Sequence, residues 1–134
     1  MKHLNYPFFI FAFILFVALS CDRDKTDPFD SAKKSILGKW EIIELGNWPL
    51  MNPCPANGYN EYLPDNTVRF FDYESEQVTS QMRYWIDSLL HESITREDGF
   101  ELILDYRYEF YENKLRLDSK SFMIYNTSIY KRIN

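Results

Sequence analysis

The stretch that decides the fold class is LILDYRYEF, residues 102–110, in which apolar and polar side chains alternate. Successive side chains of a strand point to opposite faces, so one face of this segment would carry Leu102, Leu104, Tyr106, Tyr108 and Phe110. Such alternation is typical of an antiparallel strand with one buried face and one solvated face. Turn residues follow at Glu112-Asn113, and apolar positions return in Leu115-Arg116-Leu117, which predicts a β-hairpin.

Further hairpins are predicted on the N-terminal side of this one. Asp98-Gly99 is a typical two-residue hairpin turn. Pro64-Asp65-Asn66-Thr67 separates the apolar runs 59–63 and 68–73, and its Pro and Asn suit the corner positions of a turn. Near the C-terminus, residues 128–133 predict the last strand.

The segment between residues 76 and 94 permits two interpretations. Its apolar residues recur at helical spacing, namely Val78, Met82, Trp85, Ile86, Leu89 and Leu90. Read as a strand, it alternates Met82, Tyr84 and Ile86 with Arg83, Trp85 and Asp87. The aromatic residues at its centre and the strand-like neighbouring segments favour the strand.

The first strand is expected at residues 36–45, after one helical turn at residues 30–34 with Ser31 as the N-cap. Residues 46–57 hold three of the six Pro residues, which predicts a long irregular loop. The sequence thus contains about eight short strands joined by hairpin turns. This pattern predicts an all-β fold, either a small antiparallel up-and-down barrel or a sandwich.

Composition narrows the range of partners. The protein has 134 residues, 46% of them hydrophobic and 18% aromatic, which suits one domain with a real core and favours strands. The formal net charge is −5, and Lys and Arg form no cluster. Nucleic-acid binding depends on clustered positive charge, so we expect no nucleic-acid partner.

Residues 1–20 are expected to be a lipoprotein signal peptide. Lys2 supplies positive charge, and the uncharged apolar run 8–19 is too short to anchor the protein across a membrane. Ala18-Leu19-Ser20-Cys21 resembles a bacterial lipobox, with Ala18 at a position where Leu is usual. The resemblance implies that Cys21 carries acyl chains, palmitate among them. The alternative is an ordinary secretory signal that leaves Cys21 as a plain thiol.

Residues 21–35 are expected to form a flexible tether, since their first part is charged and poor in apolar residues. We therefore expect a protein of the bacterial cell envelope, held by its lipid at the outer membrane and facing the periplasm or the cell surface. Asp22, Asp24 and Asp27 loosely resemble the acidic signal that sends some lipoproteins to the surface. The alternative is a solvated tether that carries no sorting signal.

Few residues offer chemistry for catalysis. If Cys21 is acylated, Cys54 is the one thiol left, in the rigid run Asn52-Pro53-Cys54-Pro55. His91 is the one His after the signal segment, and Glu92 beside it would point to the opposite face of a strand. Phosphate-binding loops and metal-ligand spacings are absent from the sequence. We therefore expect no enzyme, no cofactor and no metal site.

Leu37-Gly38-Lys39-Trp40 at the start of the first strand resembles the Gly-x-Trp motif of lipocalins. With the run of hairpins and a basic residue late in the sequence, residues 36–134 resemble the short lipocalin-like domains of bacterial lipoproteins. The resemblance implies a barrel floor made of Gly38 and Trp40, with Arg132 stacked on the Trp40 ring. Trp40 as an ordinary core aromatic of an unrelated β-sandwich is the alternative.

Two functions fit these expectations. The first is binding of a small apolar or amphipathic ligand inside the barrel, with tentative contacts from Phe70, Leu104, Tyr106, Tyr108, Phe110 and Trp48. The alternative is that this inner stripe of aromatic residues only forms the hydrophobic core and binds no ligand. The second function is a protein-interaction or inhibitor module of an envelope complex, acting through the loop that carries Trp48. In that case Trp48 would be a contact residue, although it could equally cover the barrel mouth.

Overall fold

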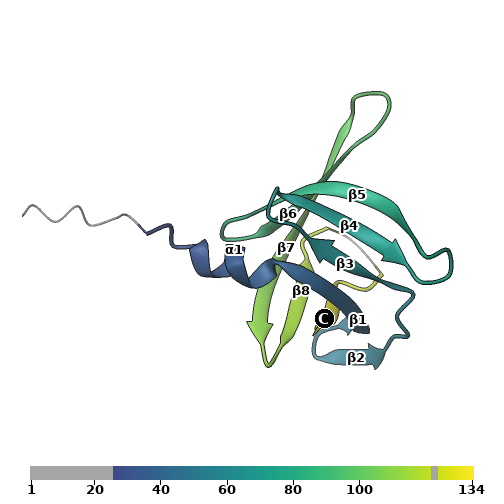
Figure 1. Cartoon of the computed structure of the whole chain (residues 1–134). Helices are drawn as coiled ribbons and strands as arrows, with labels where there is room; N and C mark the ends of the chain where they lie inside the picture. Colours follow the sequence, from purple (N-terminus) through teal and green to yellow (C-terminus); the bar gives the residue numbers. More distant parts are fainter. Residues whose placement is uncertain (1–25, 122–123) are drawn as a thin grey trace, which may run out of the picture.

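The computed structural model describes residues 26–121 and 124–134, and these form one short helix and nine strands. In sequence order the elements are α1 (Asp30–Ile36), β1 (Gly38–Asn47), β2 (Leu50–Pro53), β3 (Gly58–Tyr62), β4 (Thr67–Asp72), β5 (Gln77–Ile86), β6 (Leu90–Thr95), β7 (Glu101–Tyr111), β8 (Lys114–Ser119) and β9 (Thr127–Ile133). Figure 1 shows them wound into one barrel, with α1 at the left of the view.

Eight of these strands close an antiparallel up-and-down barrel. Neighbours in the barrel are neighbours in sequence from β3 to β9, and β1 completes the ring by pairing with β3 on one side and β9 on the other. The short β2 pairs with the last four residues of β1 and stands outside the ring. The predicted small all-β barrel is therefore confirmed.

The turns explain why the strands pair in this register. Glu112 and Asn113 join β7 to β8, and both have positive φ, 45° and 62°. A two-residue hairpin turn with positive φ at both positions matches the right-handed twist of its strands. Asn66, in the turn between β3 and β4, also has positive φ, 65°, as its position in the predicted turn required.

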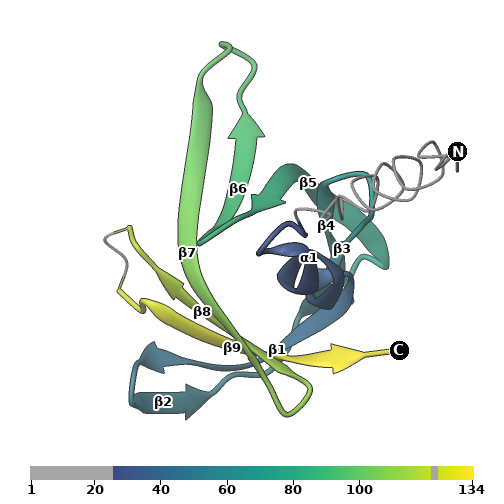
Figure 2. The same ribbon diagram turned by 90° about the vertical axis from the view of Figure 1, so that its left-hand side faces the viewer.

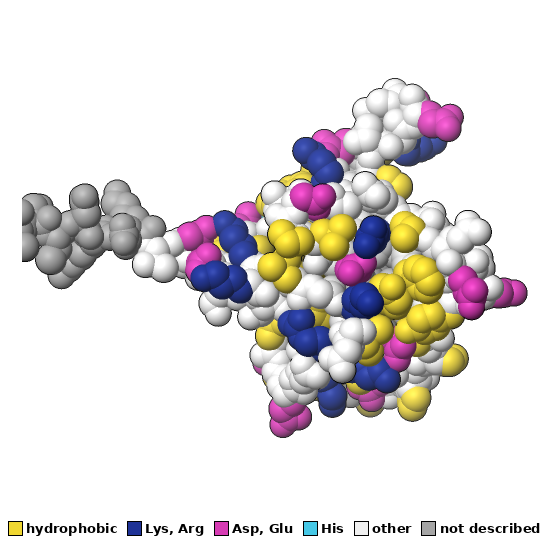
Figure 3. All heavy atoms as spheres, in the orientation of Figure 1, with side chains coloured by type: hydrophobic (Ala, Val, Ile, Leu, Met, Phe, Trp, Pro, Cys, Tyr) yellow, Lys and Arg dark blue, Asp and Glu magenta, His cyan; other side chains and the backbone are white. Residues whose placement is uncertain are grey.

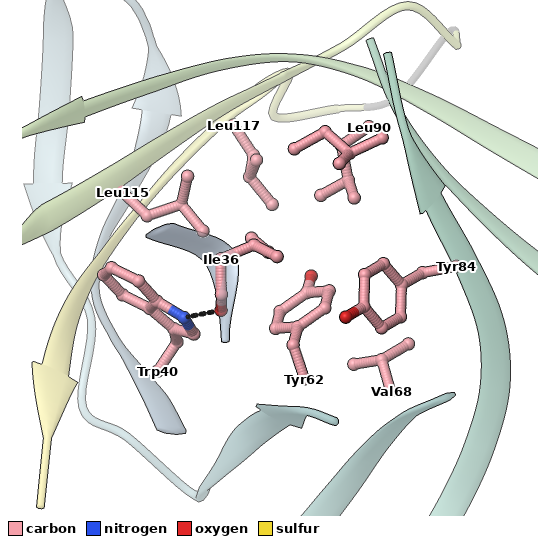
Figure 4. Packing of buried hydrophobic residues seen from close by; sticks show 9 residues of the cluster. Ile36, Trp40, Tyr62, Val68, Tyr84, Leu90, Leu115 and Leu117 are labelled. Carbon is pink, nitrogen blue, oxygen red and sulfur yellow. Dashed lines mark hydrogen bonds between the residues drawn. The ribbon is translucent and has the colours of Figure 1, made fainter. Parts of the chain in front are cut away.

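The barrel has a closed end and an open end. The closed end carries α1, the β7–β8 turn and the C-terminus of the protein, and Figure 2 shows α1 lying across it. The opposite end, here called the mouth, carries the connections 73–76 and 96–100 and the described residues 120–121 and 124–126. The buried side chains gather toward the closed end and are drawn in Figure 4, among them Ile36, Trp40, Tyr62, Val68, Tyr84, Leu90, Leu115 and Leu117.

Helix α1 belongs to the fold because its last residue, Ile36, is fully buried. The helix begins at Asp30, so residues 30–35 of the expected tether are helical. Its N-cap is Phe29, without a side-chain cap, rather than the predicted Ser31. The apolar Ile36 in contact with the core stabilises this short helix more than local capping does.

The ambiguous middle segment is a strand, as favoured: β5 covers its first part and β6 its last. Two details of the prediction are wrong. Residues 46–57 are not wholly irregular, because they contain β2. Five residues, not two, connect β6 to β7, and Arg96 N–H donates to the Phe100 carbonyl at 2.8 Å while Gly99 takes the turn with φ of 81°.

The hairpin of β6 and β7 projects beyond the ring (Figure 2). Residues 101–105 of β7 pair with β6 but not with β8, which pairs only with residues 106–111. Leu102 and Ile103 are therefore 43% and 45% exposed. The expectation that the whole stripe from Leu102 to Phe110 is buried is wrong at Leu102, because no neighbouring wall covers this part of β7.

The outer surface is mixed in character. On the face drawn in Figure 3, hydrophobic side chains gather over the β3–β4 region, with Lys, Arg, Asp and Glu interspersed. Tyr59 stacks on Phe71 there at 5.1 Å between ring centroids, and Lys39 Nζ lies 5.2 Å from the Tyr59 ring. Within the described residues, no helix is long and apolar enough to cross a membrane.

Candidate binding cavity

A cavity of about 620 Å³ opens at the mouth of the barrel. Its walls come from β1, β7, β8 and β9 and from the connection between β8 and β9. The lining residues are Ile42, Leu45, Tyr106, Leu117, Ser119, Ile124, Tyr125, Asn126, Ser128 and Tyr130. Most of them are apolar or aromatic, and hydroxyl groups are the commonest polar groups among them, as in many sites that bind small amphipathic molecules.

Small residues at inward positions explain why this half of the barrel is open. Tyr106 lies opposite Ser119, and Leu117 lies opposite Ser128, on neighbouring strands of the inner face. One step toward the closed end, the corresponding pair is Leu115 and Tyr130, and Leu115 is fully buried. The two Ser side chains leave volume that Leu or Tyr fills nearer α1.

A second space of about 220 Å³ lies beside the first. It shares Ile42 and Tyr130 with the larger cavity and is otherwise lined by residues of β1, β3 and β4, including Trp40 and Phe70. The two spaces are thus neighbours on either side of β1.

Glu92 on β6 is an acidic side chain inside this apolar barrel. It is 6% exposed, and Tyr62 Oη donates a hydrogen bond of 2.5 Å to its Oε1. Since β4 and β5 separate β3 from β6 in the sheet, this bond crosses the interior. Burial raises the pKa of Glu92, although the hydrogen bond from Tyr62 opposes that rise.

Tyrosine hydroxyl groups surround the same region. Burial and the nearby Glu92 carboxylate raise the pKa of Tyr106 well above the usual value, and they raise the pKa of Tyr130 to about 12. Both rings line the larger cavity. They remain neutral hydroxyls at physiological pH, able to donate and accept hydrogen bonds.

The closed end contains the three residues expected there. Arg132 Cζ lies 4.3 Å from the Trp40 ring centroid, as the predicted stacking requires. Arg132 also donates to two carbonyl oxygens at the end of α1, Nη1 to Leu37 at 2.6 Å and Nη2 to Ser35 at 2.5 Å. Trp40 Nε1 donates to the Ile36 carbonyl at 2.7 Å. The stacked pair therefore ties α1 across the end of the barrel.

Gly38 leaves the space that this arrangement needs. Its φ is 113°, a conformation that favours glycine, and a Cβ atom there would lie 2.9 Å from Arg132 Nη1. The Gly-x-Trp spacing thus serves closure of the barrel end. The larger cavity opens at the other end.

The residues expected to contact a ligand have different positions. Tyr106 lines the larger cavity and Phe70 the smaller one. Tyr108 and Phe110 pack against the buried core, and Leu104 lies opposite Glu92 in the sheet. Trp48 is outside the barrel, where Arg116 Cζ stands 4.6 Å from its ring centroid.

Trp48 belongs to an exposed apolar rim beside the mouth. We use the name rim patch for Trp48, Leu50, Ile124 and Tyr125, which are 53%, 79%, 87% and 52% exposed. The two segments are joined by Asn47, whose Nδ2 donates to the Ile124 carbonyl at 3.4 Å and whose Oδ1 accepts from Asn126 N–H at 3.1 Å. Trp48 therefore flanks the mouth and does not cover it.

His91 is occupied on both ring nitrogens. Nδ1 lies 2.6 Å from Asp105 Oδ1, Nε2 lies 3.1 Å from Asp87 Oδ1, and the ring stacks on Trp85 at 4.8 Å. Burial lowers the pKa of His91, but the two carboxylates outweigh it and raise the pKa above 6.5. As expected for neighbours on a strand, His91 and Glu92 are on opposite faces: Glu92 bonds across the interior, and His91 pairs with Asp105 on the outer wall.

Other candidates for chemistry do not converge. Cys54 is a free thiol whose Sγ lies 3.7 Å from the Pro55 carbonyl oxygen. Within residues 26–121 and 124–134, no group of three His, Cys, Asp or Glu side chains could hold a metal ion. The expected signal peptide and the lipidated Cys21 lie outside the described residues.

No protein-family model matches the sequence, and no curated protein matches it significantly. Glu92 is the residue of this region that the sequence interpretation missed. The signal was the order Leu90, Glu92, Ile94, in which an acid occupies an apolar face of alternating positions.

Proposed function

We propose that the protein is a membrane-tethered, lipocalin-like lipoprotein of the bacterial envelope that binds one small apolar or amphipathic molecule in its mouth cavity. The cavity of about 620 Å³ inside a closed barrel carries this proposal. Protein sites for small molecules commonly measure roughly 300–1,000 Å³ and are lined mainly by apolar side chains. Barrels of about eight strands have just enough interior for one such ligand.

The lipocalin-like assignment within this proposal is supported by the closed end. Gly38, Trp40 and the late basic residue Arg132 stand together where the resemblance implies a barrel floor. These residues stabilise one end of the barrel, so the inner residues at the other end are free to be small. Separation of a rigid floor from an open mouth is what a ligand-binding barrel requires.

A neutral fluorescent probe tests ligand binding. N-phenyl-1-naphthylamine fluoresces in apolar surroundings, and we expect one molecule to bind per protein molecule. Ser128 lines the cavity opposite Leu117, so the indole ring of Ser128→Trp would fill the cavity and should abolish the signal. Ser88→Trp, at an exposed position near the closed end, is the matched control and should leave binding unchanged. Equal binding by both variants would place the probe elsewhere and contradict the proposal.

The lipid anchor is proposed from the resemblance of Ala18-Leu19-Ser20-Cys21 to a lipobox after an apolar signal segment. Two or three acyl chains hold a protein stably on a bilayer, whereas one does not. We expect mass spectrometry of the N-terminal peptide to find Cys21 as the acylated first residue, and Cys21→Ser to move the protein to the soluble fraction. Cleavage at another position with an unmodified Cys21 would refute the anchor without affecting the cavity.

The rim patch supports a second candidate function, an interaction or inhibitor module of an envelope complex. Four large apolar side chains stand exposed together there, and Trp48 is additionally held by Arg116. Aromatic residues fixed at a surface are frequent hot spots of protein interfaces. A photo-crosslinker at position 50 in intact cells should form a discrete adduct, which a crosslinker at exposed position 97 should not form.

A further inference from the structure

The Glu92 carboxyl group has unused hydrogen-bonding capacity. In the part of the protein that the structure describes, its one hydrogen-bond donor is Tyr62 Oη, which serves Oε1. The other oxygen is not sealed away, since Arg116 Nε is the one fully buried side-chain N or O atom without a hydrogen bond among the described residues. Glu92 Oε2 therefore keeps some exposed surface and accepts no hydrogen bond from the described residues.

No cationic side chain faces this carboxylate. Burial raises the pKa of Glu92, the hydrogen bond from Tyr62 opposes that rise, and no Lys or Arg of the described residues contributes. The titratable groups around Glu92 are tyrosines from three other walls, Tyr62 on β3, Tyr106 on β7 and Tyr130 on β9. A buried carboxylate without a counter-ion is costly, and a cation that enters the site offsets this cost.

Tyr106 links the larger cavity to the neighbourhood of Glu92. In the sheet, Tyr106 lies opposite Leu90 and Leu104 lies opposite Glu92, so the Tyr106 side chain is the diagonal neighbour of Glu92 on the inner face. Tyr106 also lines the cavity of about 620 Å³. Its hydroxyl has no hydrogen-bond partner among the described residues, so it too is available to a ligand.

We propose that Glu92 binds the ammonium head of an amphipathic amine, whose apolar tail lies in the mouth cavity. Tyr106, Tyr62 and Tyr130 add hydroxyl acceptors and aromatic faces, both of which attract a cation. A fatty acid with an alkyl chain as long as that of the amine would bring a second carboxylate toward Glu92 and is excluded by like-charge repulsion. This inference rests on the proposed function, because it assumes that the mouth cavity is where the ligand binds.

Three probes of equal alkyl length separate the possibilities. We would measure binding of octylamine, octanol and octanoate to the purified protein by isothermal titration calorimetry near neutral pH. Octylamine should bind most tightly and octanoate least. Glu92→Gln should weaken octylamine about tenfold or more, leave octanol unchanged and improve octanoate, because only the charge is removed. Tyr106→Phe should weaken octylamine by a smaller factor.

Two controls protect this interpretation. Glu97→Gln removes the same charge from an exposed loop and should change none of the three affinities. Circular dichroism and thermal melting should show that Glu92→Gln is folded.

The outcomes distinguish the two proposals. If octanol binds and octylamine or octanoate binds no differently from it, the cavity function stands and the role of Glu92 is refuted. The role of Glu92 is equally refuted if Glu92→Gln leaves the affinity for octylamine unchanged. If none of the three probes binds, the cavity is not a ligand site and both proposals fail.

Discussion

Replacing Arg132 by Met isolates the contribution of the closed end to stability. The change removes hydrogen bonds to the carbonyl oxygens of Leu37 and Ser35, of 2.6 and 2.5 Å, and the charge that lies 4.3 Å from the Trp40 ring. Met keeps an apolar stem of similar length, so the packing against the ring is retained. The variant therefore tests the charge and the hydrogen bonds rather than the loss of volume.

The expected loss can be worked out from these contacts. A hydrogen bond to a charged group contributes about 1.5 kcal/mol at the lower end of its range, and the cation–π contact about 1 kcal/mol. Water can reach the freed carbonyl oxygens in part, because Arg132 is only half-buried. We expect the free energy of unfolding to fall by about 3 kcal/mol, which lowers Tm by roughly 12 °C for a domain of this size.

Equilibrium urea unfolding, followed by tryptophan fluorescence and circular dichroism, measures this loss. Lys131→Met is the matched control, since Lys131 is the preceding residue of β9 and pairs with Glu41 at 2.9 Å on the outer surface. An exposed pair of this kind contributes about 0–1 kcal/mol. If Arg132→Met and Lys131→Met destabilise the protein equally, the closed end does not depend on Arg132 and the reasoning is wrong.

Three further predictions concern stability. Gly38→Ala should cost at least about 1 kcal/mol in urea unfolding, because φ of 113° strains any Cβ and the methyl group displaces Arg132. Glu92→Gln should stabilise the protein at neutral pH and flatten its pH profile. The folded pKa of Glu92 is raised above 4.5, so the folded state holds the proton more tightly than the unfolded state does. The free energy of unfolding of the parent protein therefore falls as pH rises from 4.5 to the folded pKa, by about 1.4 kcal/mol per pKa unit. A profile of Glu92→Gln parallel to the parent's would contradict this. His91→Asn should lower Tm more near pH 5.5 than near pH 9. Because the pKa of His91 is raised, the stabilisation from its charged ring is present below pH 6.5 and is lost as pH rises through the folded pKa. An equal loss of Tm at both pH values would refute the charged pairing with Asp87 and Asp105.

Local patterns in the sequence were sufficient for the barrel. The turns at Asn66 and Glu112-Asn113 need residues that tolerate positive φ, and the structure has them there. The alternation from residue 104 to 110 placed Tyr106, Tyr108 and Phe110 toward the interior. Because period-two alternation and turn chemistry are local properties, they can be read without knowledge of the partners of each strand.

Long-range features were beyond the sequence patterns. Leu102 continues the alternating stripe but is exposed, since the pairing of β7 with β8 stops at Tyr106. The cavity depends on Ser119 and Ser128 facing Tyr106 and Leu117 across neighbouring strands, which requires the register. Glu92 was visible only as an acid on an apolar face. Its place inside the barrel is shown by the hydrogen bond from Tyr62, which is thirty residues away in sequence.

The position of α1 determines how an anchored barrel would stand. If Cys21 carries the lipid, eight residues lie between it and Asp30, and the two Cα atoms are at most about 30 Å apart. Helix α1, to which this segment leads, lies at the closed end of the barrel, whereas the cavity opens at the opposite end, a strand length away. The floor would then face the bilayer and the opening would face the aqueous compartment. Cargo would be exchanged with soluble molecules or a carrier protein, rather than drawn sideways out of the membrane to which the protein is tied.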